Sequence, residues 1–299
     1  MLGSVMRAEC VLQAGEVSDR VAAGILATSG RPDRPVRLDD FWFSASDAHN
    51  LCPRLFAIAV AGKISVRGAV GPDSLWNMAL GTGFHHALQN EMLPLLGDVM
   101  QGGWRRVSAG GDLVEIVRGK TVGPWTEEGR GWGPRPPGDY WEFVEPKGRV
   151  PKVRLVGKWD GVLVWPDAPS EVLEIKSIRE DLFASVNPRM GGKPQAKHIL
   201  QVQAYMWMSG LTRARLVYVA KGSGELRAVM AEHVVARDDE QIMGLEAMLG
   251  RCWDAVQAAQ ETPAPPLPDR CEGCRIKSDT RARKCEMRDR CFPAKVKAA

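Results

Sequence analysis

The sequence lacks the features of a membrane or secreted protein. No apolar run is long enough to span a bilayer, and the N-terminal residues show no basic segment followed by an apolar one. The sequence also has no large excess of one charge, because it contains 40 Lys and Arg and 36 Asp and Glu. The resulting net charge of +4 does not by itself indicate a nucleic-acid partner. With 44% hydrophobic residues, the composition predicts a cytoplasmic globular protein.

The cysteines do not form the pattern of a disulfide scaffold. There are seven, an odd number, and no secretory segment accompanies them: Cys10, Cys52, Cys252, Cys271, Cys274, Cys285 and Cys291. Four of the seven fall between residues 271 and 291. Such crowding favours a bound metal or metal cluster.

Apolar periodicity predicts an α/β protein with a mixed central sheet flanked by helices. A Gly-, Pro- and Trp-rich stretch at 119–139 predicts a loop. Gly210 is predicted to end the third helix. We expect helices from about Ser46, at 74–96, at 195–209 and from about Asp238, and strands at 140–146, 152–165, 170–178, 214–221 and 225–235.

The segment KWDGVLVWPDAPSEVLEIKS, residues 158–177, predicts a β-hairpin with charges on one face. If the turn is centred near Asp167, paired residue numbers add up to about 334. This register sets Asp160 opposite Glu174, and side chains of directly paired residues share a face. Lys176 is two residues from Glu174 and is expected on that same face. A slip of one residue would destroy the arrangement.

Two adjacent carboxylates repel each other unless a cation lies between them. Their oxygen atoms suit Mg²⁺ or Mn²⁺, and a neighbouring lysine can polarise a phosphate oxygen or position a water. This is equipment for metal-assisted phosphodiester hydrolysis. The alternative is a surface hairpin whose Asp–Lys or Glu–Lys pair contributes little.

Four ordered motifs resemble the RecB-like branch of the PD-(D/E)XK nuclease superfamily. They are Gly81-Thr82-Gly83-Phe84-His85, Gly157-Lys158-Trp159-Asp160-Gly161, Glu174-Ile175-Lys176 and Gln201-Val202-Gln203-Ala204-Tyr205. Each motif is weak alone, but their order matches that of the family. The resemblance covers roughly residues 46 to 292 and implies a restriction-endonuclease-like fold.

The resemblance also implies roles for individual residues. His85, Asp160, Glu174 and the backbone carbonyl of Ile175 would bind the catalytic metal. Lys176 would orient or activate the attacking water and stabilise the transition state. The family assigns contacts with the DNA backbone or the lysine to two residues that are four apart on one helix, here Gln201 and Tyr205. His86 points about 100° away from His85 on a helix, and the motif spacing favours His85.

The cysteines allow two metal assignments. The segment around Cys52 is similar to that of iron–sulfur nucleases in this branch, such as the AddB nuclease domain and the CRISPR-associated RecB-like exonucleases. That likeness implies a [4Fe–4S] cluster that stabilises the fold and does no redox work. The favoured ligands are Cys52, Cys274, Cys285 and Cys291, with Cys271 the spare. The alternative is Zn²⁺ held by Cys271, Cys274, Cys285 and Cys291.

Residues 1–45 are expected to form an N-terminal segment, 46–262 the nuclease core, and 263–299 a Cys-rich segment packed on that core. The resemblance implies a metal-dependent DNA exonuclease acting in recombination, repair or phage DNA processing. Its partners would be single-stranded DNA or duplex ends, with a recombination protein or a second copy of the chain as further candidates and no membrane. The alternative is a catalytically idle DNA-binding or assembly subunit.

Overall fold

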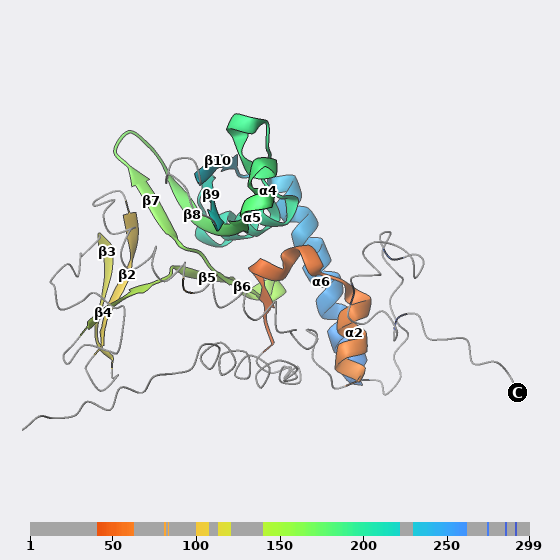
Figure 1. Cartoon of the computed structure of the whole chain (residues 1–299). Coiled ribbons are helices and arrows are strands. Elements are labelled where there is room, and N and C mark those ends of the chain that lie inside the picture. The colour runs from red at the N-terminus through yellow and green to blue at the C-terminus, as the bar shows by residue number, and fades with distance from the viewer. Residues whose placement is uncertain are drawn as a thin grey trace, which may run out of the picture.

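The computed structural model describes residues 41–62, 81, 83, 100–107, 113–120, 140–221, 230–261, 274, 285 and 291. Its described part is a mixed α/β fold in which helices flank two mixed sheets (Figure 1). None of the described helices combines the length and the apolar character needed to cross a membrane.

The larger sheet has the strand order β10-β9-β8-β7-β2-β3, and β4 pairs with β2. Its described strands all pair antiparallel except β8 and β9, which run parallel. A parallel pair needs a crossover connection, and helix α5 (Ala196–Ser209) lies in the connection from β8 to β9. The strands are β2 (Met100–Val107), β3 (Leu113–Lys120), β4 (Tyr140–Val144), β7 (Gly161–Trp165), β8 (Ala168–Arg179), β9 (Arg213–Lys221) and β10 (Met230–Ala236).

The predicted hairpin is confirmed in β7 and β8. Val162 pairs with Val172, and Gly161 pairs with Leu173, so paired numbers add up to 334 as expected. Towards the turn the register shifts, and Trp165 pairs with Ala168. The turn is therefore tighter than the sequence indicates, and the shift leaves the register at the charged end of the hairpin unchanged.

The predicted single strand at 152–165 is wrong, because the chain changes sheets within it. A short 3₁₀ helix, η5 (Pro151–Val153), is followed by β6 (Leu155–Lys158), and β7 begins at Gly161. β6 belongs to a second sheet with the order β1-β6-β5, built with β1 (Phe43–Ser44) and β5 (Lys147–Val150). Trp159 and Asp160 form the break between the two sheets.

Helix α5 covers one face of the larger sheet. Its buried Val202 and Met206 belong to one apolar core with Val172, Leu216 and Tyr218 from strands β8 and β9. The opposite face of these strands has a separate core with Leu163, Leu173, Ile175, Val217 and Val219. The helix ends as predicted at Gly210, whose φ of 75° is the left-handed conformation that favours glycine.

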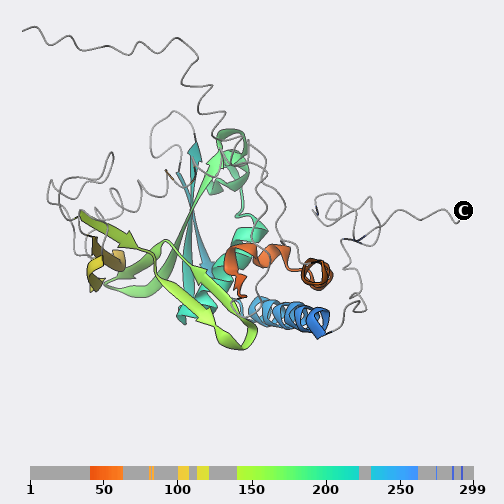
Figure 2. The ribbon, with the colours of Figure 1, turned by 90° about the horizontal axis from the view of Figure 1, so that it is seen from below.

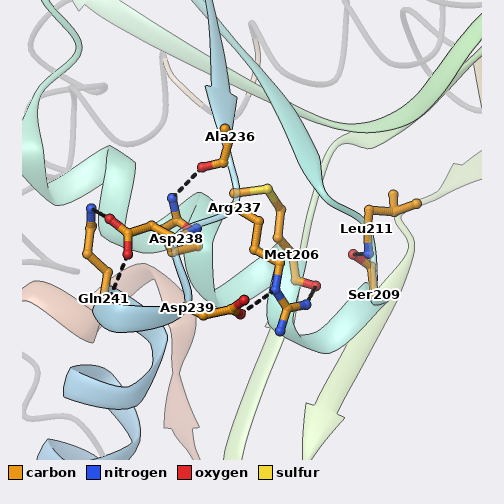
Figure 3. Close-up of polar contacts among 9 residues, drawn as sticks. Met206, Ser209, Leu211, Ala236, Arg237, Asp238, Asp239 and Gln241 are labelled. Atoms are coloured by element: carbon orange, nitrogen blue, oxygen red, sulfur yellow. Dashed lines mark hydrogen bonds and ion pairs between the residues drawn. The ribbon is translucent and has the colours of Figure 1, made fainter.

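The corner between β10 and α6 (Asp239–Glu261) is tied to α5 by hydrogen bonds (Figure 3). Buried Gln203 donates to the carbonyl of Ala236 at 2.8 Å and accepts from the Asp238 N–H at 2.9 Å. Asp238 caps α6 by accepting from the Gln241 N–H at 3.0 Å. The predicted helix start near Asp238 is confirmed, and the crossover helix and α6 are fixed to each other.

The helix predicted from Ser46 is divided in the structure. A 3₁₀ helix, η1 (Ala45–Asn50), is followed by α2 (Pro53–Ala61), whose N-cap is Cys52. A helix tolerates proline only in its first turn, so Pro53 marks the start of α2. Helix α2 lies alongside α6 in both views, and small residues allow this close approach: Ala57, Ala255 and Ala259 (Figures 1 and 2).

Two glycines let the β5–β6 ribbon lie against α5. Gly148 and Gly157 are paired across the ribbon. A Cβ at Gly157 would lie 2.7 Å from Met208 Cε, 2.8 Å from Tyr205 Cε1 and 3.0 Å from Ala45 Cβ. These separations are shorter than van der Waals contact, so glycine is required at position 157 for the ribbon to pack closely against α5.

We predict that Gly157→Ala destabilises the protein by about 1–3 kcal/mol, the usual cost of overpacking. Urea denaturation of the two proteins measures the change. Gly244→Ala is the matched control, because Gly244 is an exposed position in α6 where a Cβ meets nothing within 4 Å. That control should stabilise α6 by about 0.5–1 kcal/mol through helix propensity. Equal stability of Gly157→Ala and wild type would contradict the close packing.

Candidate active site

Asp160 lies at the break between β6 and β7, and two backbone hydrogen bonds hold it against β8. Its N–H donates to the Leu173 carbonyl at 3.1 Å, and its Oδ2 accepts from the Ile175 N–H at 2.6 Å. The residue is only 4% exposed. Because the Ile175 N–H follows Glu174 directly, this bond brings the Asp160 carboxylate to the Glu-x-Lys motif.

Glu174 is the centre of a polar network on the α5 side of the sheet. It is 4% exposed, its Oε1 accepts from Gln201 Nε2 at 3.0 Å, and the same oxygen forms an ion pair with Lys176 Nζ. Gln201 Nε2 also donates to the Tyr205 hydroxyl oxygen at 2.5 Å. Lys176 is partly exposed, so the network reaches from the core to solvent.

The Tyr205 hydroxyl is held in its neutral form. Burial raises the pKa of Tyr205 well above its usual range, and the negative charge of Glu174 raises it further. Asp160 acts in the same direction, so both carboxylates lie close enough to influence this ring. The hydroxyl therefore remains a hydrogen-bond donor throughout the neutral and alkaline range.

A histidine–tyrosine pair borders the network one helical turn before Gln201. His198 Nδ1 and the Tyr218 hydroxyl are 2.9 Å apart, and the Gln195 N–H donates to the same hydroxyl oxygen at 3.0 Å. Burial, assisted by the positive charge of Lys176, lowers the pKa of His198 to about 3. At neutral pH the imidazole is uncharged, so one of its ring nitrogens carries a proton and the other can accept a hydrogen bond.

The sequence motifs did not identify Tyr218 as a neighbour of the site. Tyr218 belongs to β9, pairs with Lys176 in the parallel register, and is fully buried. Burial raises the pKa of its hydroxyl to about 12. Its only sequence signal is a tyrosine within a run of buried aliphatic residues, where a hydroxyl needs a partner.

The described residues fit a divalent cation in the chemistry of their donor atoms. Two buried carboxylates flank Ile175, and carboxylate and backbone carbonyl oxygens are the ligands that Mg²⁺ and Mn²⁺ prefer. Among the residues that the structure describes, no group of three His, Cys, Asp or Glu side chains could hold a metal ion. The third predicted ligand side chain, His85, lies outside them.

The motif that contains His85 is described at two positions. Gly81 and Gly83 are helical, as the sequence predicts. A Cβ at Gly81 would lie 3.7 Å from Ser177 Oγ, one residue beyond Lys176. The beginning of this motif therefore lies next to the part of β8 that carries Lys176.

The C-terminal cysteines approach the helix that follows Cys52. Cys291, which is 9% exposed, packs with Ile58 and Ala59 of α2, and Cys285 contacts the same apolar cluster. Arg54 Nε donates to Cys291 Sγ at 3.1 Å, two residues after Cys52. Segments more than 230 residues apart are therefore brought together at the start of α2.

The other cysteines divide into three cases. Cys274 is buried. Cys252 of α6 is buried in the larger apolar core. Cys10 and Cys271 lie outside the described residues. The five cysteines that the structure describes form no disulfide with one another.

Comparisons with known proteins give distant structural likenesses alone. No protein-family model matches the sequence, and no curated protein does. An alkaline exonuclease from Laribacter hongkongensis aligns over 74% of this chain and 90% of its own, with 15% identity and a TM-score of 0.43. A phage-related exonuclease from Haemophilus somnus 129PT aligns over 74% and 96%, with 11% identity and a TM-score of 0.37. Both TM-scores are below 0.5, so the functional argument rests on the site itself.

We predict that His198 makes folding stability sensitive to acid. Its pKa is lowered from 6.5 to about 3, so the unfolded chain binds a proton that the folded chain excludes. Stability from the neutral imidazole is fully present above pH 6.5 and is lost as the pH falls towards 3. Urea denaturation at several pH values should give a shallower acid dependence for His198→Gln than for wild type. Parallel curves would refute the assignment.

Proposed function

We propose that the protein is a metal-dependent deoxyribonuclease that hydrolyses a phosphodiester bond with water. The observation that supports this most strongly is the joining of Asp160, Glu174 and Lys176 by one buried hydrogen bond and one ion pair, at the break between two sheets. A buried acid beside a second buried acid is costly unless a cation compensates the charge. A solvated surface hairpin would not bury both carboxylates.

Each residue has a role that its contacts allow. Asp160, Glu174, His85 and the Ile175 carbonyl would hold one Mg²⁺ or Mn²⁺, which supplies Lewis-acid polarisation of the phosphodiester and activation of water. Lys176, which is partly exposed, would orient that water and stabilise the charge that develops on the phosphate. Gln201 keeps the Glu174 carboxylate in place.

Tyr205 and Gln201 act as supports for the two carboxylates. Since the Tyr205 hydroxyl accepts from Gln201, its own proton is available for a further acceptor in the site. A buried neutral donor next to a negatively charged centre favours a defined carboxylate orientation. The four motifs favour DNA as the substrate and exonuclease action as the reaction. The setting that they favour is recombination, repair or phage DNA processing. A recombination protein or a second copy of the chain is the further partner they suggest.

The first test compares DNA cleavage by wild type, Glu174→Gln and Lys176→Met. End-labelled single-stranded and duplex DNA are incubated with Mg²⁺ or Mn²⁺, and products are resolved by length. We expect both variants to lose cleavage by at least about a hundredfold, because removing one group that stabilises developing charge has this effect. Asp181→Asn removes an exposed carboxylate outside the network and should cleave like wild type.

The result that would overturn the assignment is equal cleavage by wild type and Glu174→Gln. Circular dichroism of each variant confirms that the fold is retained. DNA binding without cleavage by wild type, with either metal, would replace the nuclease with the idle DNA-binding subunit.

We also propose that Cys52, Cys274, Cys285 and Cys291 hold a [4Fe–4S] cluster. The approach of Cys285 and Cys291 to α2 supports this choice over zinc, because Zn²⁺ bound by the four late cysteines would not require Cys52. Arg54, whose guanidinium donates to Cys291 Sγ, would lie beside the proposed cluster. The cluster would join the Cys-rich segment 263–299 to the core at 46–262.

Anaerobic purification and a visible spectrum test the cluster separately from cleavage. We expect a broad band near about 400 nm, typical of iron–thiolate clusters. Cys52→Ala should lose iron and colour, whereas Cys271→Ala and the buried Cys252→Ala should keep both. A colourless protein in which zinc is lost with Cys271→Ala but not with Cys52→Ala would establish the zinc alternative.

A further inference from the structure

The outer face of the three-stranded sheet β1-β6-β5 carries three exposed cations and no acid. Lys147 and Arg149 lie on β5 and Lys158 on β6, and all three are exposed. They share one face because Lys147 pairs with Lys158 and Arg149 with Val156. The strands of this sheet contain no acidic residue. We call this surface the basic face.

The residues on the opposite face of the β5–β6 ribbon determine which side chains point outward. Gly148 and Gly157, which alternate with the cations, face α5, where Cβ atoms would meet Met208 at 2.8 and 2.7 Å. A slip of one residue would bury the lysines and expose the glycines. The close packing that requires glycine inside therefore also directs the three cations outward.

The charges on the basic face are not compensated within the part of the chain that the structure describes. Lys147 and Lys158 are directly opposite each other, an arrangement that is destabilising for like charges. None of the described ion pairs involves Lys147, Lys158 or Arg149, and Arg149 lies instead over the ring of Trp42 at 5.4 Å. A cost of this kind is offset when an anionic ligand binds.

The position of the basic face connects it to the candidate active site. β6 ends at Lys158, and Asp160 follows two residues later. In Figure 1 the β5–β6 ribbon extends from the β2–β4 strands to the helices that follow β1. A chain lying along this ribbon would be led to the break where Asp160 meets β8.

The size of the basic face fits one nucleic-acid strand better than a duplex. Three strands spaced about 4.8 Å apart give a width of about 10 Å, and four residues of about 3.3 Å give a length of about 13 Å. Each strand of B-form DNA has one phosphate per about 3.4 Å of helix axis, and the phosphates of an extended single strand are farther apart, so this length takes up about two or three of them. Trp42, half-buried and adjacent to Arg149, offers an aromatic surface to a base.

We propose that the basic face binds the backbone of single-stranded DNA and guides that strand to the candidate active site. The proposal rests on the proposed nuclease function for its choice of ligand. Lys147, Arg149 and Lys158 contact phosphates, and Trp42 stacks on a base. The face is separate from the residues assigned to hydrolysis, so binding and cleavage can be measured independently.

The test measures affinity for a fluorescein-labelled oligothymidylate strand by anisotropy over a series of salt concentrations. All proteins carry Asp160→Asn, and gel analysis verifies that the strand remains intact. The track variant combines Lys147→Gln, Arg149→Gln and Lys158→Gln. Loss of three phosphate contacts should lower the slope of log K against log salt by about 2 and the affinity at 0.1 M salt by up to about a hundredfold.

The matched control removes three exposed cations elsewhere, Arg189→Gln, Lys193→Gln and Arg251→Gln, for the same change in net charge. We expect it to keep the salt slope of the parent. If the track variant binds DNA as tightly as the parent, the proposal that the basic face binds DNA is wrong. It is also wrong if the control variant loses as much affinity as the track variant. Trp42→Leu should lower single-strand affinity about tenfold through lost stacking, with little change in the salt slope.

Two further outcomes separate this proposal from the proposed function. If wild type with an intact Asp160 cleaves DNA but the track variant binds normally, the nuclease stands and the basic face is wrong. If the track variant loses affinity while wild type never cleaves, the basic face stands and the nuclease is wrong. An equal loss for a blunt hairpin duplex would show that the face binds duplex DNA, against the single-strand proposal.

Discussion

The hydrogen bond from the Ile175 N–H to Asp160 is the contact on which the candidate site depends. It joins the point where the chain changes sheets to the middle of β8, with a separation of 2.6 Å in a buried environment. A charge-assisted bond of this kind is strong, and the acid would be costly to bury without it. Through it, the turn between β6 and β7 and the Glu-x-Lys motif become one rigid unit.

Helix α5 supports this unit from the other side, and its packing on the second sheet explains the glycines of that sheet. Gln201 donates to Glu174 and to Tyr205, while Gln203 on the same helix binds the corner before α6. One helix can contact both Glu174 and the corner before α6, because Gln201 and Tyr205 are four residues apart and share one face, whereas Gln203 lies on another face. The glycine at 157 then brings the β5–β6 ribbon against Tyr205. The close packing of the β5–β6 ribbon on α5 therefore determines both the surroundings of Tyr205 and the exposure of the basic face.

Much of the hairpin and of α5 was predictable, because both follow from local rules. The register that places Asp160 near Glu174 came from the centre of a turn and the two-residue period of a strand. Gly210 followed from the preference of helix ends for the left-handed conformation. The continuous strand at 152–165 was wrong, since an apolar run shows no signal of which sheet it joins. The divided helix after Ser46 was signalled by Pro53 and overlooked.

By itself, the sequence determined the types of residue at the candidate site, their order, and which of them share a face of one strand or helix. These are local properties, set by backbone periodicity and side-chain chemistry. The tertiary structure alone decided that Tyr218 partners His198, that Cys291 lies against Arg54, and that three cations from two strands form one surface. Each of these joins residues from different elements, and burial with close packing selects such contacts over the whole chain at once. No local pattern encodes them.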